Sequence, residues 1–181
     1  MKFGKPFKIP DGRYFVKPED RKLVQLNNVV LKTPFAEGDT LTLELPQAAQ
    51  DAVKSVDKDI LVAAQENSTE WFSKEVKPQT LEAAYTKSLS ETIMNVSKMR
   101  NQSTRAYSAS KEQIDPSVFV SDSVCDVVIE LIGVWFMKKS FGSSWRIIQM
   151  REKVPPKPKW SEQYLFEDSE SEKEEEEEDY L

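Results

Sequence analysis

The sequence has no histidine, one cysteine and five glycines among its 181 residues. The absence of histidine excludes a Ser-His-Asp triad and every zinc site that uses an imidazole ligand. The single cysteine, Cys125, excludes an internal disulfide and a cysteine-cluster metal site. No GxGxxG or P-loop pattern is present, and no apolar run approaches the roughly 18 residues that a membrane span needs. We therefore expect an intracellular, soluble protein that is not an enzyme and needs no cofactor or membrane.

Charge is distributed unevenly along the chain. Residues 167–181 contain ten acidic side chains and one lysine, a net charge of −9, whereas the whole chain carries −6. Residues 1–166 therefore carry a net charge of +3, and a mildly basic body precedes a strongly acidic tail. A segment of this composition has too little apolar surface to bury, so we predict that the tail is disordered.

The first half of the body begins with strand patterns. The first 17 residues hold five basic side chains and two prolines, Pro6 and Pro10, which favour an extended arm or an edge strand. Residues 23–33 are rich in β-branched and apolar types, and residues 39–45 place leucine at every second position. Both segments are predicted to be strands, and the second is predicted to be half-buried.

The hydrophobic period then changes to that of a helix. Between Pro46 and about Val76, apolar or small residues recur at helical spacing, which predicts one long helix. A shorter helix is predicted over residues 79–88 and a strand over residues 90–98. The polar and basic segment 99–117 is typical of a loop.

A β-hairpin is the strongest pattern in the chain. Residues 124–137 predict a long strand with an apolar odd-numbered face and a mixed even-numbered face, and residues 144–151 predict its partner. Strands with a long helix after the third are typical of an OB-like five-stranded barrel with its helix between strands 3 and 4, although an α+β sheet crossed by one helix would give the same pattern. We favour the OB-like barrel, formed by residues 1–152 and followed by a Pro-rich linker, 153–166, and the acidic tail, 167–181.

Cations and aromatic rings occur close together in the arm, the loop and the hairpin. Single-stranded nucleic acid is bound by cations that follow its phosphates and by flat rings on which its bases stack. We therefore predict a nucleic-acid-binding site formed by Lys5, Lys8, Arg13, Arg100, Arg105, Tyr107, Phe136, Lys138, Lys139, Phe141, Trp145 and Arg146.

The aromatic residues of the hairpin also have a structural explanation. Trp135 lies on the apolar face of its strand and is predicted to belong to the core. Phe136, on the mixed face, and Phe141, in a basic turn, are the better candidates for base stacking. Trp145 has one core-like and one surface-like neighbour, so both roles stay open for it.

Three carboxylates of the hairpin share one face of their predicted strand. Asp122, Asp126 and Glu130 could hold a divalent cation there, because carboxylate oxygens are suitable ligands. Such a face also carries charges merely because water covers it, and no lysine-rich nuclease pattern accompanies these residues. We therefore predict no metal site and no catalytic residue.

The acidic tail ends in an aromatic and an aliphatic residue. Repeated negative charge beside a flat ring imitates single-stranded DNA, so the tail could occupy a cationic groove until DNA displaces it towards partner proteins. We predict this role for Glu174, Glu175, Glu176, Glu177, Glu178, Asp179, Tyr180 and Leu181.

Two segments and the tail resemble a known family. Residues 66–76 contain the pattern NSxxWF, and residues 127–150 contain GxWFxxxSFGxxW. Both resemble regions of the replicative single-stranded DNA-binding proteins of nucleocytoplasmic large DNA viruses, an OB-fold group related to the single-stranded DNA-binding protein of short-tailed phages. The acidic tail with a terminal aromatic residue is similar to the tail of that family. The resemblance covers about half of the chain.

The resemblance implies an OB barrel that binds single-stranded DNA without sequence preference during viral DNA replication, and a tail that recruits replication proteins. It also implies a location in the viral replication compartment, in the host cytoplasm or nucleus. A body with a charge of only +3 is weakly basic for such a role. The alternatives are a viral structural or minor virion assembly protein that uses the aromatic hairpin as a protein interface, and a transcription accessory protein that uses the tail alone. An exposed hairpin edge would permit a homodimer.

Overall fold

A long antiparallel hairpin forms the spine of the computed structural model, which describes residues 1–98 and 104–153. Strand β10 (Val124–Phe136) is joined to β11 (Phe141–Glu152) by a tight turn, in which the Met137 amide donates a hydrogen bond to the Ser140 carbonyl. The sequence predicted this hairpin. β11 begins before the predicted residue 144, because Phe141 is paired directly with Phe136 across the turn.

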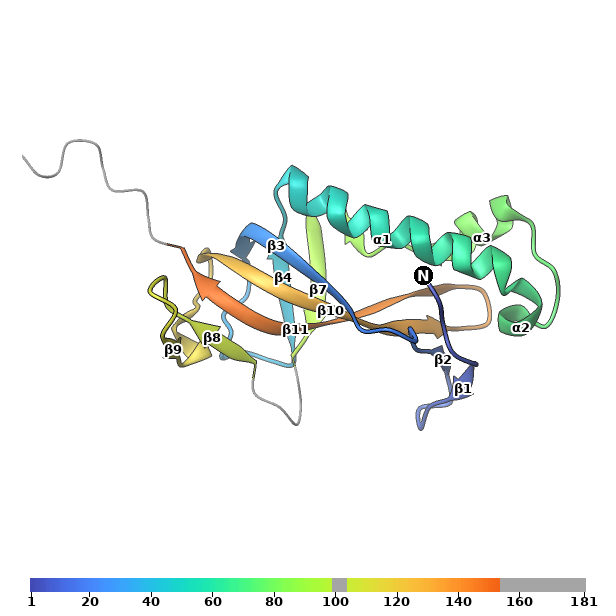
Figure 1. Ribbon diagram of the computed structural model, residues 1–181, viewed down its shortest axis with the longest axis horizontal. Helices are drawn as coiled ribbons and strands as arrows, with labels where there is room; N and C mark the ends of the chain where they lie inside the picture. The colour runs from blue at the N-terminus through green and yellow to red at the C-terminus, as the bar shows by residue number, and fades with distance from the viewer. Residues whose placement is uncertain (99–103, 154–181) are drawn as a thin grey trace, which may run out of the picture.

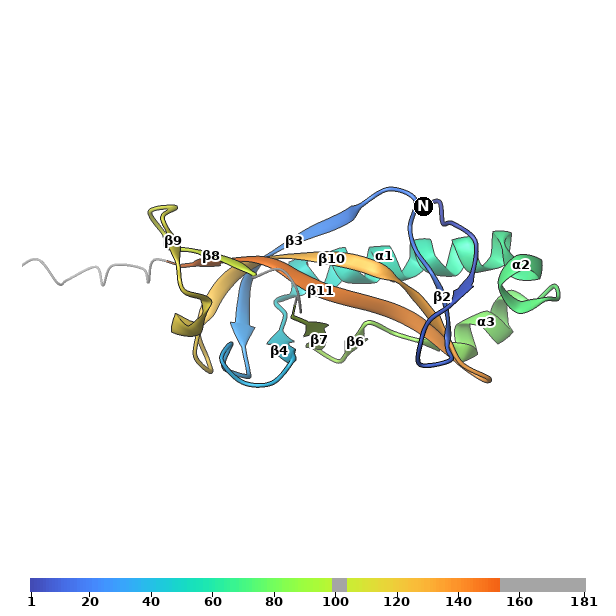
Figure 2. The same cartoon turned by 90° about the horizontal axis from the view of Figure 1, so that it is seen from below.

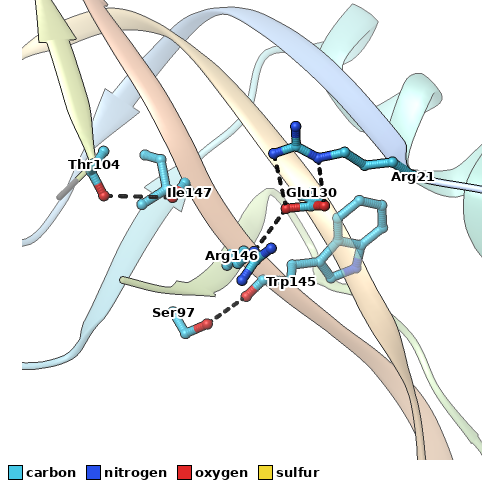
Figure 3. Close-up of polar contacts among 7 residues, drawn as sticks. All are labelled: Arg21, Ser97, Thr104, Glu130, Trp145, Arg146 and Ile147. Carbon is cyan, nitrogen blue, oxygen red and sulfur yellow. Dashed lines mark hydrogen bonds and ion pairs between the residues drawn. The ribbon is translucent and has the colours of Figure 1, made fainter. Parts of the chain in front are cut away.

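Five strands close a circuit through backbone pairing. β3 (Lys22–Leu31), β4 (Thr40–Glu44) and β7 (Ile93–Ser97) are antiparallel neighbours in that order. The sequence predicted a strand at each of these three positions. β10 pairs with both β3 and β11, and β7 pairs in parallel with β11. The β7–β11 link is narrow: it consists of the pair Ser97 and Arg146, with the Ser97 hydroxyl donating to the Trp145 carbonyl (2.9 Å; Figure 3).

Further strands extend this circuit into an 11-stranded mixed sheet, so the predicted plain five-stranded barrel is too simple. They are β1 (Phe7–Lys8), β2 (Tyr14–Val16), β5 (Tyr85–Thr86), β6 (Leu89–Ser90), β8 (Arg105–Tyr107) and β9 (Gln113–Ile114). β8 and β9 lie in the segment 99–117, which was predicted to be a loop. That prediction is wrong for these strands because two or three residues are too few to show a hydrophobic period, whereas pairing with β11 is enough to order β8.

Within the described residues, three α-helices accompany the sheet, α1 (Gln47–Glu66), α2 (Ser68–Phe72) and α3 (Pro78–Ala84), and a 3-10 helix spans Pro116–Val118. α1 buries the apolar stripe that predicted it, including Val53, Val56 and Ile60. The predicted helix to Val76 is interrupted at Asn67, whose side-chain amide donates to the Ala63 carbonyl (2.8 Å) and satisfies the helix end. No helix among the described residues is long and apolar enough to cross a membrane.

The helices lie between the second and third strands of the circuit, not between strands 3 and 4 as predicted. The difference arises because the strands of the basic arm lie outside the circuit: β1 pairs with β2, and β2 pairs with the far end of β10. Figures 1 and 2 show the result: β8 and β9 lie at one end of the long hairpin, whereas α2, α3, β1 and β2 surround the other end.

An irregularity in β10 changes which side of the strand is buried. Cys125, Ile129 and Leu131 face the core as predicted, but the register shifts between Leu131 and Gly133. Beyond this bulge the buried residues are even-numbered, so Phe136 enters the core while Trp135 becomes half-buried. Gly133 is required at the bulge, because a Cβ atom there would lie 2.1 Å from the Val16 carbonyl oxygen.

Candidate nucleic-acid interface

One outward face of the sheet collects basic side chains from several strands. Val127 and Ile129 of β10, Met150 of β11 and Ala106 of β8 are buried, so the residues between them point outward. Backbone register aligns these outward residues in rows across β3, β10, β11 and β8. We call this surface the cationic face and define it by Arg21, Arg105, Lys111, Arg146, Arg151 and Lys153.

Glu130 of β10 holds two arginines of the cationic face in place. Arg21 donates from Nε to one carboxylate oxygen at 2.7 Å, and Arg146 donates from Nε to the other at 2.8 Å (Figure 3). Burial raises the pKa of Glu130, but the hydrogen bonds from Arg21 and Arg146 outweigh it, so the net pKa is lower than usual. The carboxylate is therefore charged at neutral pH.

Asp126, on the same face of β10, binds a second pair of cations, Arg151 and Lys153. Its carboxylate accepts from Arg151 Nη2 at 2.5 Å, from Lys153 Nζ at 3.1 Å and from the Asn28 amide at 3.1 Å. Burial raises its pKa, and these donors more than compensate, so the net pKa is again lower than usual. The two carboxylates stand about 13 Å apart along the strand.

The two buried carboxylates order the cationic face without neutralising it. The side chains of Asp126 and Glu130 are only 5% and 9% exposed, whereas those of the four cations that they hold are 36–58% exposed. Six cations against two carboxylates leave four positive charges on this surface. The cations are thus presented to solvent at fixed spacings, an arrangement that suits a polyanion.

An aromatic ring borders the cationic face. Tyr107 of β8 lies opposite Arg151 in the register of β11 and is half-buried. Together with Gln25, Gln149 and Arg151 it lines a pocket of about 220 Å³. This end of the molecule therefore combines cations with a ring, as a single-strand binder requires.

A second basic and aromatic surface lies at the opposite end of the hairpin. A hollow of about 790 Å³ opens there between the β10–β11 turn, the β1–β2 turn and the α2–α3 segment. We call it the distal hollow and define its rim by Arg13, Tyr14, Phe72, Lys74, Met137, Lys138 and Lys139. Tyr14 and Met137 are 55% and 58% exposed. Lys74, Lys138 and Lys139 have no ion-pair partner in the part of the chain that the structure describes.

The structure divides the predicted binding residues between these two surfaces. Arg105, Tyr107 and Arg146 meet at the cationic face. The distal end receives Lys8, Arg13, Phe136, Lys138, Lys139 and Phe141, and Lys5 lies exposed on the arm that leads there. Trp145 lies in the core between the two surfaces. Arg100 and the tail residues 174–181 lie outside the described residues.

The two predicted stacking residues, Phe136 and Phe141, belong to the core instead, and so does Trp145, for which both roles were open. Phe136, Phe141 and Trp145 are 9%, 1% and 4% exposed, which leaves almost no ring surface for a base. Phe136 and Phe141 stack on each other, with ring centroids 6.0 Å apart, and both contact Phe72. The Trp145 indole donates to the hydroxyls of Ser88 and Ser143. The prediction failed for Phe136 because the bulge reverses the faces of β10.

The predicted site left out four of the six cations of the cationic face: Arg21, Lys111, Arg151 and Lys153. A signal for the three that bind a carboxylate is the pair of acidic residues, Asp126 and Glu130, on an otherwise apolar strand. A buried carboxylate needs charged partners, so cations had to flank that strand. In the structure these carboxylates form ion pairs with arginine and lysine side chains. Residues 1–98 and 104–153 contain no group of three or more side chains that could hold a metal ion.

Comparison with known proteins identifies a family and a fold. Residues 27–168 match the model of a family of unknown function, DUF5871. No curated protein matches the sequence. A C-terminal truncation of the single-stranded DNA-binding protein from bacteriophage Enc34 superposes with a TM-score of 0.51 at 12% sequence identity, covering 87% of this chain and 98% of that one.

Two further structures of the phage protein are similar at the same 12% identity. The protein itself gives a TM-score of 0.49, covering 91% of this chain and 96% of that chain, and its complex with single-stranded DNA gives 0.47, covering 85% and 97%. At this identity the likeness to the truncated phage protein concerns the fold alone.

Proposed function

Since the chain belongs to the DUF5871 family, whose function is unknown, we propose from its surface chemistry that it binds single-stranded DNA through the cationic face. One observation carries the proposal: two buried carboxylates hold four partly exposed cations at fixed positions, and one of these cations, Arg151, lies beside Tyr107. Cations that are already positioned lose less side-chain entropy when they contact phosphates. Contacts to phosphate carry no sequence information, so binding is independent of sequence except where a base is contacted.

The fold is consistent with this function. The circuit of β3, β4, β7, β11 and β10 is, in our proposal, an OB-type barrel that the additional strands elaborate. The phage protein whose truncated form shares this fold is a single-stranded DNA-binding protein. A single strand exposes its bases, and a sheet face with one half-buried ring can accept a base where a duplex would present only phosphates.

The acidic tail completes the proposal. With a net charge of −9, residues 167–181 are complementary to the four positive charges of the cationic face. In our proposal the tail covers this face when DNA is absent and contacts replication proteins when DNA displaces it. The protein acts without catalysis, and the resemblance to viral replicative proteins assigns it to viral DNA replication.

Fluorescence anisotropy of a labelled oligo-dT tests the proposal. Full-length protein and a version that ends at Phe166 are titrated across a salt series, with a duplex of the same length as control. We expect both to bind oligo-dT more tightly than duplex, with affinity falling steeply as salt rises, and the shorter version to bind more tightly. Absence of binding at low salt would refute the function. Equal affinity of the two versions would refute only the masking by the tail.

A second candidate function rests on the distal hollow. Tyr14 and Met137 expose apolar surface beside an aromatic floor, which is typical of a protein interface. The protein would then be a viral assembly component, or a homodimer, that uses this end of the hairpin. Met137→Asp would abolish such an association, measured by light scattering, and would leave the binding of oligo-dT unchanged.

A further inference from the structure

We infer that the pocket beside Tyr107 accepts one base of the bound strand and prefers adenine. The inference rests on the proposed function and adds a base-reading position to a surface that otherwise contacts phosphates. The lining of the pocket includes Gln25, Tyr107, Lys111, Val128, Gln149 and Arg151, with Asp126 bound to Arg151.

The backbone register builds the pocket from two neighbouring rows of the sheet. Gln25, Val128 and Gln149 lie side by side on β3, β10 and β11. In the adjacent row, Tyr107 of β8 lies beside Arg151 of β11. The β8–β9 turn, closed by the Lys111 amide donating to the Ser108 carbonyl (3.0 Å), brings Lys111 to the pocket.

The size and walls of the pocket suit a planar ring. Its volume of about 220 Å³ exceeds the roughly 150 Å³ of a protein cavity that accepts benzene. Val128 supplies an apolar surface, and the half-buried ring of Tyr107 supplies a π-face. Lys111 is exposed and contributes a positive charge for the phosphate that accompanies the base.

Some polar side chains of the pocket already form hydrogen bonds within the protein, and one does not. Arg151 is bound to Asp126, and the Gln25 side-chain amide donates to Asn27 Oδ1 at 2.9 Å. Gln149 has no side-chain hydrogen bond within the described residues, so its amide can both donate and accept. A glutamine amide can form hydrogen bonds with both N6 and N7 of adenine, whereas guanine is recognised by the guanidinium group of an arginine. The arginine of this pocket, Arg151, is already bound to Asp126.

The test uses the full-length protein and labelled 12-nucleotide oligo-dT, with and without one central dA. We expect the single dA to raise affinity about fivefold or more, the lower end of what one matched base contact contributes. Gln149→Ala should remove this gain, so that the variant binds the dA-containing and the plain oligonucleotide with equal affinity. Free dAMP should bind far more weakly than either oligonucleotide, because it brings one phosphate to a face that contacts several phosphates of a strand.

Variants of Tyr107 test the stacking part separately. Tyr107→Ala should weaken binding of both oligonucleotides about 5- to 150-fold, the range reported for loss of one base stack, whereas Tyr107→Phe should retain binding. Tyr14→Ala, which removes an exposed tyrosine from the distal end, is the matched control and should bind as wild type. Thermal unfolding of each variant establishes that it folds.

The outcomes separate this inference from the proposed function. If dA gives no gain, or if Gln149→Ala keeps the gain, or if dAMP binds as tightly as the strand, the base pocket is wrong although the protein still binds DNA. The same holds if Tyr107→Ala binds as well as Tyr14→Ala. If no oligonucleotide binds at low salt, the proposed function fails, and the pocket fails with it.

Discussion

The cationic face and the distal hollow both combine positive charge with aromatic rings, yet they are organised differently. At the cationic face, Asp126 and Glu130 hold four cations at fixed positions. At the distal hollow, Lys74, Lys138 and Lys139 lack such partners in the described chain, and the aromatic rings pack mainly on each other. Composition alone therefore does not identify a binding surface. Ordered cations favour a repeating anion, whereas an apolar hollow ringed by lysines without ion-pair partners in the described chain favours a protein.

The bulge in β10 produces this difference. Before it, the even-numbered residues Asp126 and Glu130 lie on the outer side of the sheet, buried beneath the cations that they bind. Beyond it, the even-numbered Val134 and Phe136 face the core. The even-numbered side chains of β10 are therefore charged before the bulge, whereas beyond it they pack in the core. The bulge depends on Gly133, because the Val16 carbonyl and the Phe15 ring occupy the space of a side chain.

Substitution of Gly133 should have the largest effect. A Cβ atom at this position would lie 2.1 Å from the Val16 carbonyl oxygen and 2.5 Å from the Phe15 ring, so Gly133→Val must displace β2 from β10. We expect the free energy of unfolding, measured with urea, to fall by about 3 kcal/mol. Gly4→Ala is the control, since its new Cβ would make only an ordinary contact at 3.8 Å with the Lys17 carbonyl. An unchanged urea midpoint for Gly133→Val would contradict the close approach.

Removal of the two buried carboxylates should have the next largest effect. The folded-state pKa values of Asp126 and Glu130 are lowered, so their stabilisation is present above the unfolded values near 4 and is lost as pH falls through the lower folded values. The double variant Asp126→Asn, Glu130→Gln should lose about 1–2 kcal/mol at pH 7, a modest figure because the cations are partly exposed. It should also lose less stability than wild type between pH 5 and pH 3.

Urea unfolding at pH 7, 5 and 3 measures both effects. Asp59→Asn with Glu82→Gln, two exposed acids on the helices, is the matched control and should behave as wild type. If the carboxylate variant were as stable as wild type at pH 7, the cations of the cationic face would not be held as the structure indicates.

A smaller effect distinguishes the two surfaces in DNA binding. Arg146→Gln with Arg151→Gln should weaken binding of oligo-dT roughly tenfold at low salt and reduce the slope of log affinity against log salt by about 1.4, because each phosphate contact on a single strand contributes about 0.7. Lys138→Gln with Lys139→Gln removes the same charge from the distal hollow and should leave the slope unchanged. The reverse result would transfer the DNA site to the distal hollow.

The last prediction concerns the thiol of Cys125, which we expect not to react with iodoacetamide in the folded protein. Burial, together with the negative charge of Asp126, raises the pKa of this thiol to about 12, so iodoacetamide at pH 8 should not modify the folded protein. Urea-unfolded protein should react fully, which provides the control, and mass spectrometry measures both. Because Cys125 lies beneath the cationic face, protection in Gly133→Val would indicate that this end keeps its structure when the distal end is disturbed.

Much of the fold could be predicted because its long elements have clear hydrophobic periods. The β4 alternation, the α1 stripe and the β10–β11 hairpin each extend over enough residues for one face to be identified. β8 and β9 could not be found, since two or three residues have no period and their pairing partner is distant in sequence. The candidate site was found only in part: Arg105, Tyr107 and Arg146 were in the predicted site, whereas Arg21, Lys111, Arg151 and Lys153 were not.

The sequence by itself determined the mildly basic body, the acidic tail, the absence of histidine chemistry and the positions of the long strands and of α1. These properties depend on composition and on local period, which act over a few residues at a time. Only the tertiary structure decided which rings are buried and which cations stand together. Those outcomes depend on the bulge at Gly133 and on the register of four strands, and register brings together residues such as Arg21 and Glu130 that lie 109 positions apart in the chain.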